Sequence, residues 1–155
     1  MHVTADPSGS DLSPSGPTER ARVLSGKPVE LSLPVEDDLL VLVRFTVSAV
    51  ASRAGFDIEE IEDLRLAVDE LCLLVLQGRR TGRLLLTMSA DPGQIDVWCH
   101  YDGTDQPRED GALGDGDDIG LSARILDALV DEHGPEPRDG RPGARLCKRR
   151  VRTDG

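Results

Sequence analysis

Two consecutive segments carry apolar residues at spacings of three and four, and this pattern constrains the fold more than any other feature. The first stripe is formed by Leu40, Val43, Val47, Val50 and Ala54. The second is formed by Ile61, Leu64, Val68, Leu71 and Val75. A period of 3.6 residues places each set on one face of a helix. The sequence therefore predicts two amphipathic helices whose apolar faces need a further layer to cover them.

The residues at the ends of these segments support helix boundaries. Acidic residues at 36–38 precede the first stripe, where they suit the positive end of a helix dipole. Gly55 follows the first stripe as a C-terminal cap. Asp57 and Glu60 have the spacing of a capping box at the start of the second helix. The two helices are thus expected to be joined by a short turn.

The rest of the chain alternates strand and helix patterns. Val29–Pro34 alternates like a strand, and segments 82–90 and 94–101 read as two strands joined by an Asp-Pro-Gly turn. A third helix is expected over 119–131, followed by a possible short strand and a last strand over 144–152. This order predicts an α/β fold, a two-layer sandwich in which helices cover one face of a mixed, mostly antiparallel sheet.

Length and composition narrow the class of protein. The 155 residues suffice for one domain, predicted over 28–152, and the Ser-, Pro- and Gly-rich residues 1–27 are expected to form a disordered tail. No apolar run is long enough to span a membrane, and no signal peptide is recognisable, which favours a cytoplasmic protein without membrane contact. The formal net charge of −11 disfavours direct binding of nucleic acid and suits a basic protein partner.

The three cysteines give no evidence of a metal centre or a disulfide framework. Cys72, Cys99 and Cys147 are odd in number and widely spaced, without a paired-ligand motif. All three lie in apolar or strand-like surroundings, which is typical of buried thiols. The sequence therefore predicts no metal site, and a redox role for any one cysteine stays an open alternative.

The segment from Val43 to Gln77, and above all IEDLRLAVDELC within it, resembles the first two helices of bacterial anti-sigma-factor serine kinases. That family shares an ATPase fold with histidine kinases, gyrase and the Hsp90 chaperone. The order of strands, the glycine-bearing loop and the closing helix are similar as well, so the resemblance covers about residues 28–152. It implies the histidine kinase-like ATPase fold, within a group whose nucleotide motifs have diverged.

The resemblance implies a Glu-x-x-x-Asn motif on the second helix, with the Glu near the nucleophile and the Asn on magnesium. Glu70 matches the acid, but Leu74 stands in the Asn position. Four residues bring both side chains to one helix face. Magnesium requires oxygen ligands, which a leucine side chain does not offer. Glu70 is therefore interpreted as a catalytic remnant, with a solvated helix acid as the alternative.

A second family motif is Asp-x-Gly after a strand, in which the Asp binds adenine. The matching stretch is HYDGTD. If Gly103 is the motif glycine, Tyr101 replaces the Asp. If Asp102 is the motif acid, Thr104 replaces the glycine. Either register lacks one element, so Gly103 is at most a remnant of the nucleotide site.

A third motif is Gly-x-Gly at the start of the last helix, where backbone N–H groups meet phosphate. Gly120 is present, but Asp118 replaces the first glycine; the run at 114–116 is a weaker match. The loop 102–118 also carries seven acidic residues against a single arginine, Arg108. A net charge of −6 beside a triphosphate is repulsive. The sequence therefore predicts no cofactor and no kinase activity, and ATP with magnesium is the alternative.

Arg44 lies at the separation from Glu70 at which the resembling family carries an arginine that contacts sigma factor or its antagonist. The resemblance thus implies an anti-sigma factor that sequesters a stress- or sporulation-type sigma factor and is released by an anti-anti-sigma (STAS-type) antagonist. It also implies a homodimer. Two alternatives remain: an active serine/threonine kinase that phosphorylates its antagonist, and a pseudokinase adaptor in other signalling.

Overall fold

The computed structural model describes residues 27–108 and 116–151, with the side chains of 116–119 left aside. The helices and strands follow one another along the chain in the order that the sequence patterns predict. Their bounds are β1 Val29–Pro34, a short 3-10 helix η2 Asp37–Leu39, α2 Leu40–Arg53, α3 Ile58–Leu76, β2 Arg83–Asp91, β3 Gln94–Asp102, α4 Gly116–Leu129, β4 Glu132–Pro135 and β5 Gly143–Arg149.

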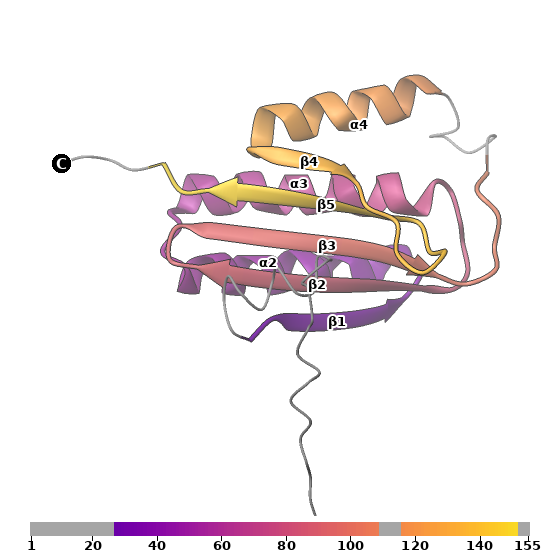
Figure 1. Ribbon diagram of the computed structural model, residues 1–155, viewed down its shortest axis with the longest axis horizontal. Helices are drawn as coiled ribbons and strands as arrows, with labels where there is room; N and C mark the ends of the chain where they lie inside the picture. Colours follow the sequence, from indigo (N-terminus) through magenta and orange to yellow (C-terminus); the bar gives the residue numbers. More distant parts are fainter. Residues whose placement is uncertain (1–26, 109–115, 152–155) are drawn as a thin grey trace, which may run out of the picture.

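The five strands form one sheet in the order β1-β2-β3-β5-β4. Helices α2 and α3 lie side by side behind this sheet, and α4 lies beyond its β4 side (Figure 1). The prediction of a two-layer α/β sandwich with helices on one face is confirmed. Each of the four pairings between the described strands is antiparallel.

The two predicted amphipathic helices are present, and their ends form as expected. Gly55 adopts φ +88°, and the N–H groups of Gly55 and Phe56 donate to Ser52 and Ala51 at 3.1 Å each. This pair of bonds is the Schellman arrangement that satisfies the last carbonyls of α2. At the start of α3, Asp57 and Glu60 form the reciprocal capping box.

The central hairpin positions the end of β3 against the end of α3. β2 and β3 pair over their full length, from Arg83 opposite Asp102 to Asp91 opposite Gln94. Gly93 turns the chain with φ +88°, as the second residue of a Pro-Gly turn requires. Side chains alternate between the two faces of a strand. Tyr101 therefore lies on the same, helix-facing side of the sheet as buried Cys99, two residues earlier.

The hydrophobic core lies between α2, α3 and the sheet. Its most buried members come from both predicted stripes and from alternate positions of the strands: Val43, Val47, Leu64, Val68, Leu71, Leu84, Leu86, Ile95, Val97 and Leu146. From α4, Leu126 also enters it. Within the described residues, none of the helices has the length and hydropathy needed to cross a membrane. The predicted tail lies almost entirely in residues 1–26, outside the described part.

Candidate functional site

Glu70 is held by a contact that joins α3 to α4. Its Oε2 accepts a hydrogen bond from Ser122 Oγ at 2.7 Å, and Ser122 is buried. Glu70 is half-buried, so it is neither a fully solvated acid nor an unengaged base. The sequence pattern did not single out Ser122, because a lone serine on a helix carries no signal of its partner.

Leu74 lies one turn further along α3, half-buried and packed against the core. Its side chain lines a cavity of about 540 Å³ between α3, α4 and the β4–β5 connection. Leu71 and Val75 line the same cavity from α3, and Ala123 and Leu126 line it from α4. The position at which the resembling family binds magnesium is therefore part of an aliphatic wall.

The end of β3 is organised around Tyr101, which is buried. Its hydroxyl donates to the Thr81 carbonyl at 2.8 Å and accepts from the Asp105 N–H at 3.1 Å. The Arg79 guanidinium lies 4.7 Å from the ring centroid. Tyr101 thus connects the end of β3 to the turn after α3. This role is structural, and it uses the hydroxyl both as a hydrogen-bond donor and as an acceptor.

Gly103 is explained by the same tyrosine. A Cβ at Gly103 would lie 2.4 Å from the Tyr101 hydroxyl oxygen, a distance that real side chains do not adopt. Asp102, the other candidate at this motif, forms an ion pair with Arg141 at 3.3 Å. The close approach of Tyr101 therefore explains why residue 103 is a glycine, and Arg141 pairs with Asp102. Neither residue needs a bound nucleotide to explain its presence.

The first part of the acidic loop is anchored to the end of α3. The Asp105 carboxylate accepts hydrogen bonds from the Arg80 and Thr81 N–H groups at 2.7 and 3.3 Å. These bonds to backbone N–H groups, led by that of Arg80, lower the pKa of Asp105. The Arg108 N–H donates to the Gln77 carbonyl at 2.9 Å. Because Asp102 and Asp105 are paired, the loop's formal charge of −6 overstates the free negative charge at this end.

The phosphate-loop candidates lie mainly beyond the described side chains. Gly120 belongs to α4 and is exposed, and a Cβ there would meet nothing within 4 Å. The packing therefore gives no reason for a glycine at this position. The alternative run at 114–116 falls partly, and the Asp118 side chain wholly, outside the described residues.

Arg44 is not a lone surface arginine. Its Nε donates to Asp69 Oδ1 on α3 at 3.1 Å, and its side chain remains 36% exposed. Burial raises the pKa of Asp69, although the Arg44 guanidinium acts in the opposite direction. The ion pair links α2 to α3 where the two helices meet, and the Arg44 side chain is still partly exposed to solvent.

Exposed apolar side chains lie on the same two helices as this ion pair. On α2, Val41 lies one turn before both Arg44 and Phe45, and on α3 Leu66 lies one turn before Asp69. Phe45 is 65% and Leu66 57% exposed. We call the five residues Val41, Arg44, Phe45, Leu66 and Asp69 the seam patch. Sequence reasoning found only its arginine, although Phe45 lies off the predicted stripe and was visible as an apolar outlier.

The three cysteines are buried, as predicted, and are free thiols. A hydrogen bond with Cys72, together with burial, raises the pKa of Cys99 well above its usual range. Burial raises the pKa of Cys147 to about 12. Thiolates are the reactive form, so none of these environments favours reactivity. Among residues 27–108 and 116–151, no group of three or more His, Cys, Asp or Glu side chains could hold a metal ion.

The sandwich of α2 and α3 on an antiparallel sheet, with Leu74 lining a cavity beneath α4, is that of an ATPase domain of the histidine kinase and Hsp90 type. No family model matches the chain. The serine-protein kinase RsbW of Bacillus subtilis (strain 168) is 41% identical over 122 residues, which cover 67% of this chain and 74% of that protein. The chain belongs to the RsbW serine-protein kinase family.

Other relatives match over shorter segments. The serine-protein kinase RsbW of Bacillus pumilus (strain SAFR-032) is 40% identical over 55 residues, 36% of this chain and 34% of that protein. The protein of the same name from Bacillus velezensis is 43% identical over 49 residues, 32% of this chain and 31% of that protein. The chain thus matches only about a third of the length of these two relatives.

Proposed function

We propose that this protein is an anti-sigma factor that sequesters an alternative sigma factor of the stress or sporulation type through the seam patch. The observation that carries the proposal is an exposed phenylalanine and a partly exposed arginine on α2, with exposed Leu66 on α3, the two helices that carry the family resemblance. Aromatic and arginine side chains are enriched among the residues that dominate binding energy at protein interfaces. Sequestration would result from covering sigma-factor surfaces that RNA polymerase needs.

The acidic character of the chain suits this role. A net charge of −11 accelerates the encounter with a basic partner, and it mainly affects association rates. Release would come from an anti-anti-sigma antagonist that competes for an overlapping surface. The homodimer implied by the resemblance and the cytoplasmic location stay predictions.

We further propose that binding occurs without phosphoryl transfer. Glu70 is engaged by Ser122, and Leu74 offers no oxygen to a metal ion. In the part of the chain that the structure describes, the cavity lined by Leu74 has no lysine or arginine that could stabilise a triphosphate. These three features support a protein that has kept the fold of the family and lost its chemistry.

The alternative is an active serine kinase, which is what the relatives' shared name states of those proteins. In that case Glu70 would have to leave Ser122 and act with an unusual metal site. Isothermal titration calorimetry with magnesium-ATP decides between the two. We expect no saturable heat, and no transfer of labelled phosphate to a purified antagonist. Micromolar, magnesium-dependent affinity with transfer would establish the kinase instead.

The sigma-factor proposal is tested by capture from the native host. Tagged protein should co-purify with a sigma factor identified by mass spectrometry, and an Arg44→Ala bait should recover clearly less of it. We expect the variant to lose no more than about 1 kcal/mol of stability, the upper range for a surface ion pair. Equal recovery by both baits would exclude Arg44 from the interface, and a catch without any sigma factor would reject the proposal.

A further inference from the structure

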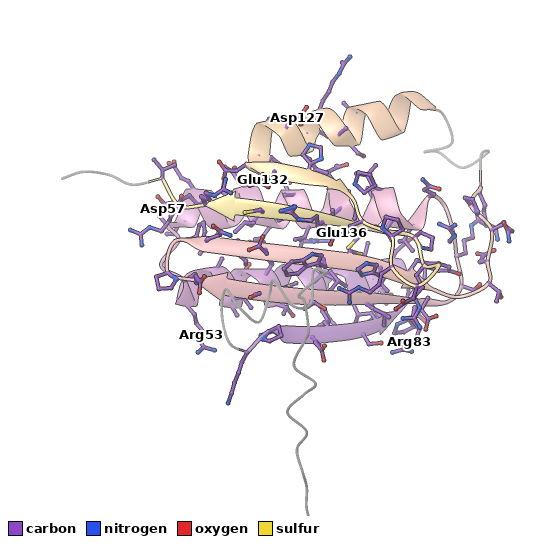
Figure 2. All side chains as sticks on the ribbon, viewed as in Figure 1. Arg53, Asp57, Arg83, Asp127, Glu132 and Glu136 are labelled. Carbon is purple, nitrogen blue, oxygen red and sulfur yellow. The ribbon has the colours of Figure 1, made fainter. Side chains whose placement is uncertain are left out.

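The cavity beneath α4 has the dimensions of a ligand site. Its volume is about 540 Å³, and pockets that bind small molecules measure about 300–1,000 Å³. Three regions line it and leave it partly open to solvent: the last two turns of α3, the middle of α4, and the connection from β4 to β5. Figure 2 shows the neighbourhood, with Asp127 on α4 above β4 and Glu136 in the chain that follows β4.

The lining of the cavity is almost entirely uncharged. Leucine, valine, alanine, proline and glycine make up most of it, and Gln77 and His133 are the polar side chains that the described residues contribute to the wall. His133 is already engaged, because its Nε2 lies 2.6 Å from Asp127 Oδ1. Within residues 27–108 and 120–151, no arginine, lysine, aspartate or glutamate lines the cavity. An ionic ligand would therefore lose its hydration without gaining a partner of opposite charge.

The wall formed by the β4–β5 connection is preorganised. Pro135, Pro137 and Pro142 all line the cavity, and proline fixes the backbone φ angle. The same segment is tied to the sheet, because the Glu136 N–H donates to the Gly143 carbonyl at 2.8 Å and the Tyr101 N–H donates to the Pro142 carbonyl at 2.9 Å. A ligand would meet a surface that needs little ordering, which favours affinity.

We propose that this cavity binds an uncharged, largely apolar small molecule in place of a nucleotide. The proposal rests on the proposed absence of phosphoryl transfer and deepens it by naming the chemistry that replaced the nucleotide. Apolar surface of the ligand would cover Leu74, Val75 and Ala123, and a single hydrogen-bonding group would meet the Gln77 carboxamide. The site is separate from the seam patch, although both use α3.

The test uses two matched fluorescent probes with the full-length protein. N-phenyl-1-naphthylamine is neutral, and 8-anilinonaphthalene-1-sulfonate has a similar ring system with an anionic group. We expect saturable binding of the neutral probe and at least about 10-fold weaker binding of the sulfonate, because the cavity does not compensate a buried charge. Magnesium-ATP should not displace the neutral probe.

Variants locate the probe. Ala123→Phe should weaken binding of the neutral probe at least about 10-fold, since added side-chain volume in a packed wall excludes it. Phe45→Asp, which removes the aromatic side chain of the seam patch, should leave the probe's affinity unchanged. If Ala123→Phe fails to fold, Leu74→Trp fills the same cavity from α3 and serves in its place.

Each result decides the proposal. Non-saturable binding, equal binding of both probes, or loss of binding in Phe45→Asp but not in the cavity variant would overturn it. Displacement by magnesium-ATP would overturn both this proposal and the absence of nucleotide chemistry. A failure of the probe to bind while sigma-factor capture stays intact would reject the ligand site alone, and leave the anti-sigma function standing.

Discussion

Replacing Phe45 with aspartate should weaken sigma-factor capture at least about 30-fold, the equivalent of about 2 kcal/mol at a residue that dominates an interface. Phe45 is 65% exposed and lies beside Arg44 on the outer side of α2. An aspartate there would remove apolar contact area and place a carboxylate in the interface. The affinity is measured by titrating the variant against the purified sigma factor recovered in the capture experiment.

The matched control is Ile58→Asp. Ile58 is 78% exposed at the first position of α3, where an acid suits the helix N-terminus. It lies beyond the seam patch, so this change should alter affinity by less than a factor of about two, an effect well below 1.4 kcal/mol. Equal losses in both variants would indicate a general charge effect and would remove the seam patch from the interface.

Truncating Leu64 to alanine should cost about 2–5 kcal/mol of the free energy of unfolding, the usual range for a buried leucine. Leu64 is fully buried at the centre of the α3 stripe and packs in the core between the helices and the sheet. The loss combines reduced burial with an unfilled cavity. Urea denaturation followed by circular dichroism measures it as a lower midpoint.

Leu66→Ala is the control on the same helix with the same chemical change. Leu66 is 57% exposed, so its truncation should change stability by no more than about 0.5 kcal/mol. As a member of the seam patch, Leu66 should instead affect sigma-factor capture. If Leu64→Ala were as stable as Leu66→Ala, the predicted stripe would not be the one that forms the core.

The sequence was most informative where local chemistry decides the structure. The α2–α3 pair, its Schellman turn at Gly55 and its capping box at Asp57 follow from residues within four positions of one another. β1 and the β2–β3 hairpin were likewise readable, because their strand patterns and the turn signal lie in continuous segments. The last helix was expected over 119–131, whereas α4 spans Gly116–Leu129. Its apolar residues recur at helical spacing only from Ile119 on, so the sequence pattern did not indicate the first turn.

The candidate site depended on contacts between distant segments, and these were not readable. Ser122 meets Glu70 across 52 residues, and Asp69 meets Arg44 across 25. Tyr101 was recognised only as an aromatic residue at the end of a strand, whereas its hydroxyl bonds explain why Gly103 is a glycine. Pairs of side chains that are far apart in the sequence can be recognised only once the fold is known, because their spacing along the chain does not indicate which residues meet.

The bond between Ser122 and Glu70 also limits what a change at Leu74 could achieve. A Leu74→Asn substitution would place one amide group among aliphatic neighbours. Glu70, one turn earlier on α3, would still be bonded to Ser122 of α4. Among the side chains that the structure describes, the adjoining cavity has no lysine or arginine to receive phosphate. On the proposed absence of phosphoryl transfer, Leu74→Asn alone should therefore create no phosphate transfer, because the acid one turn earlier on α3 stays bonded to α4.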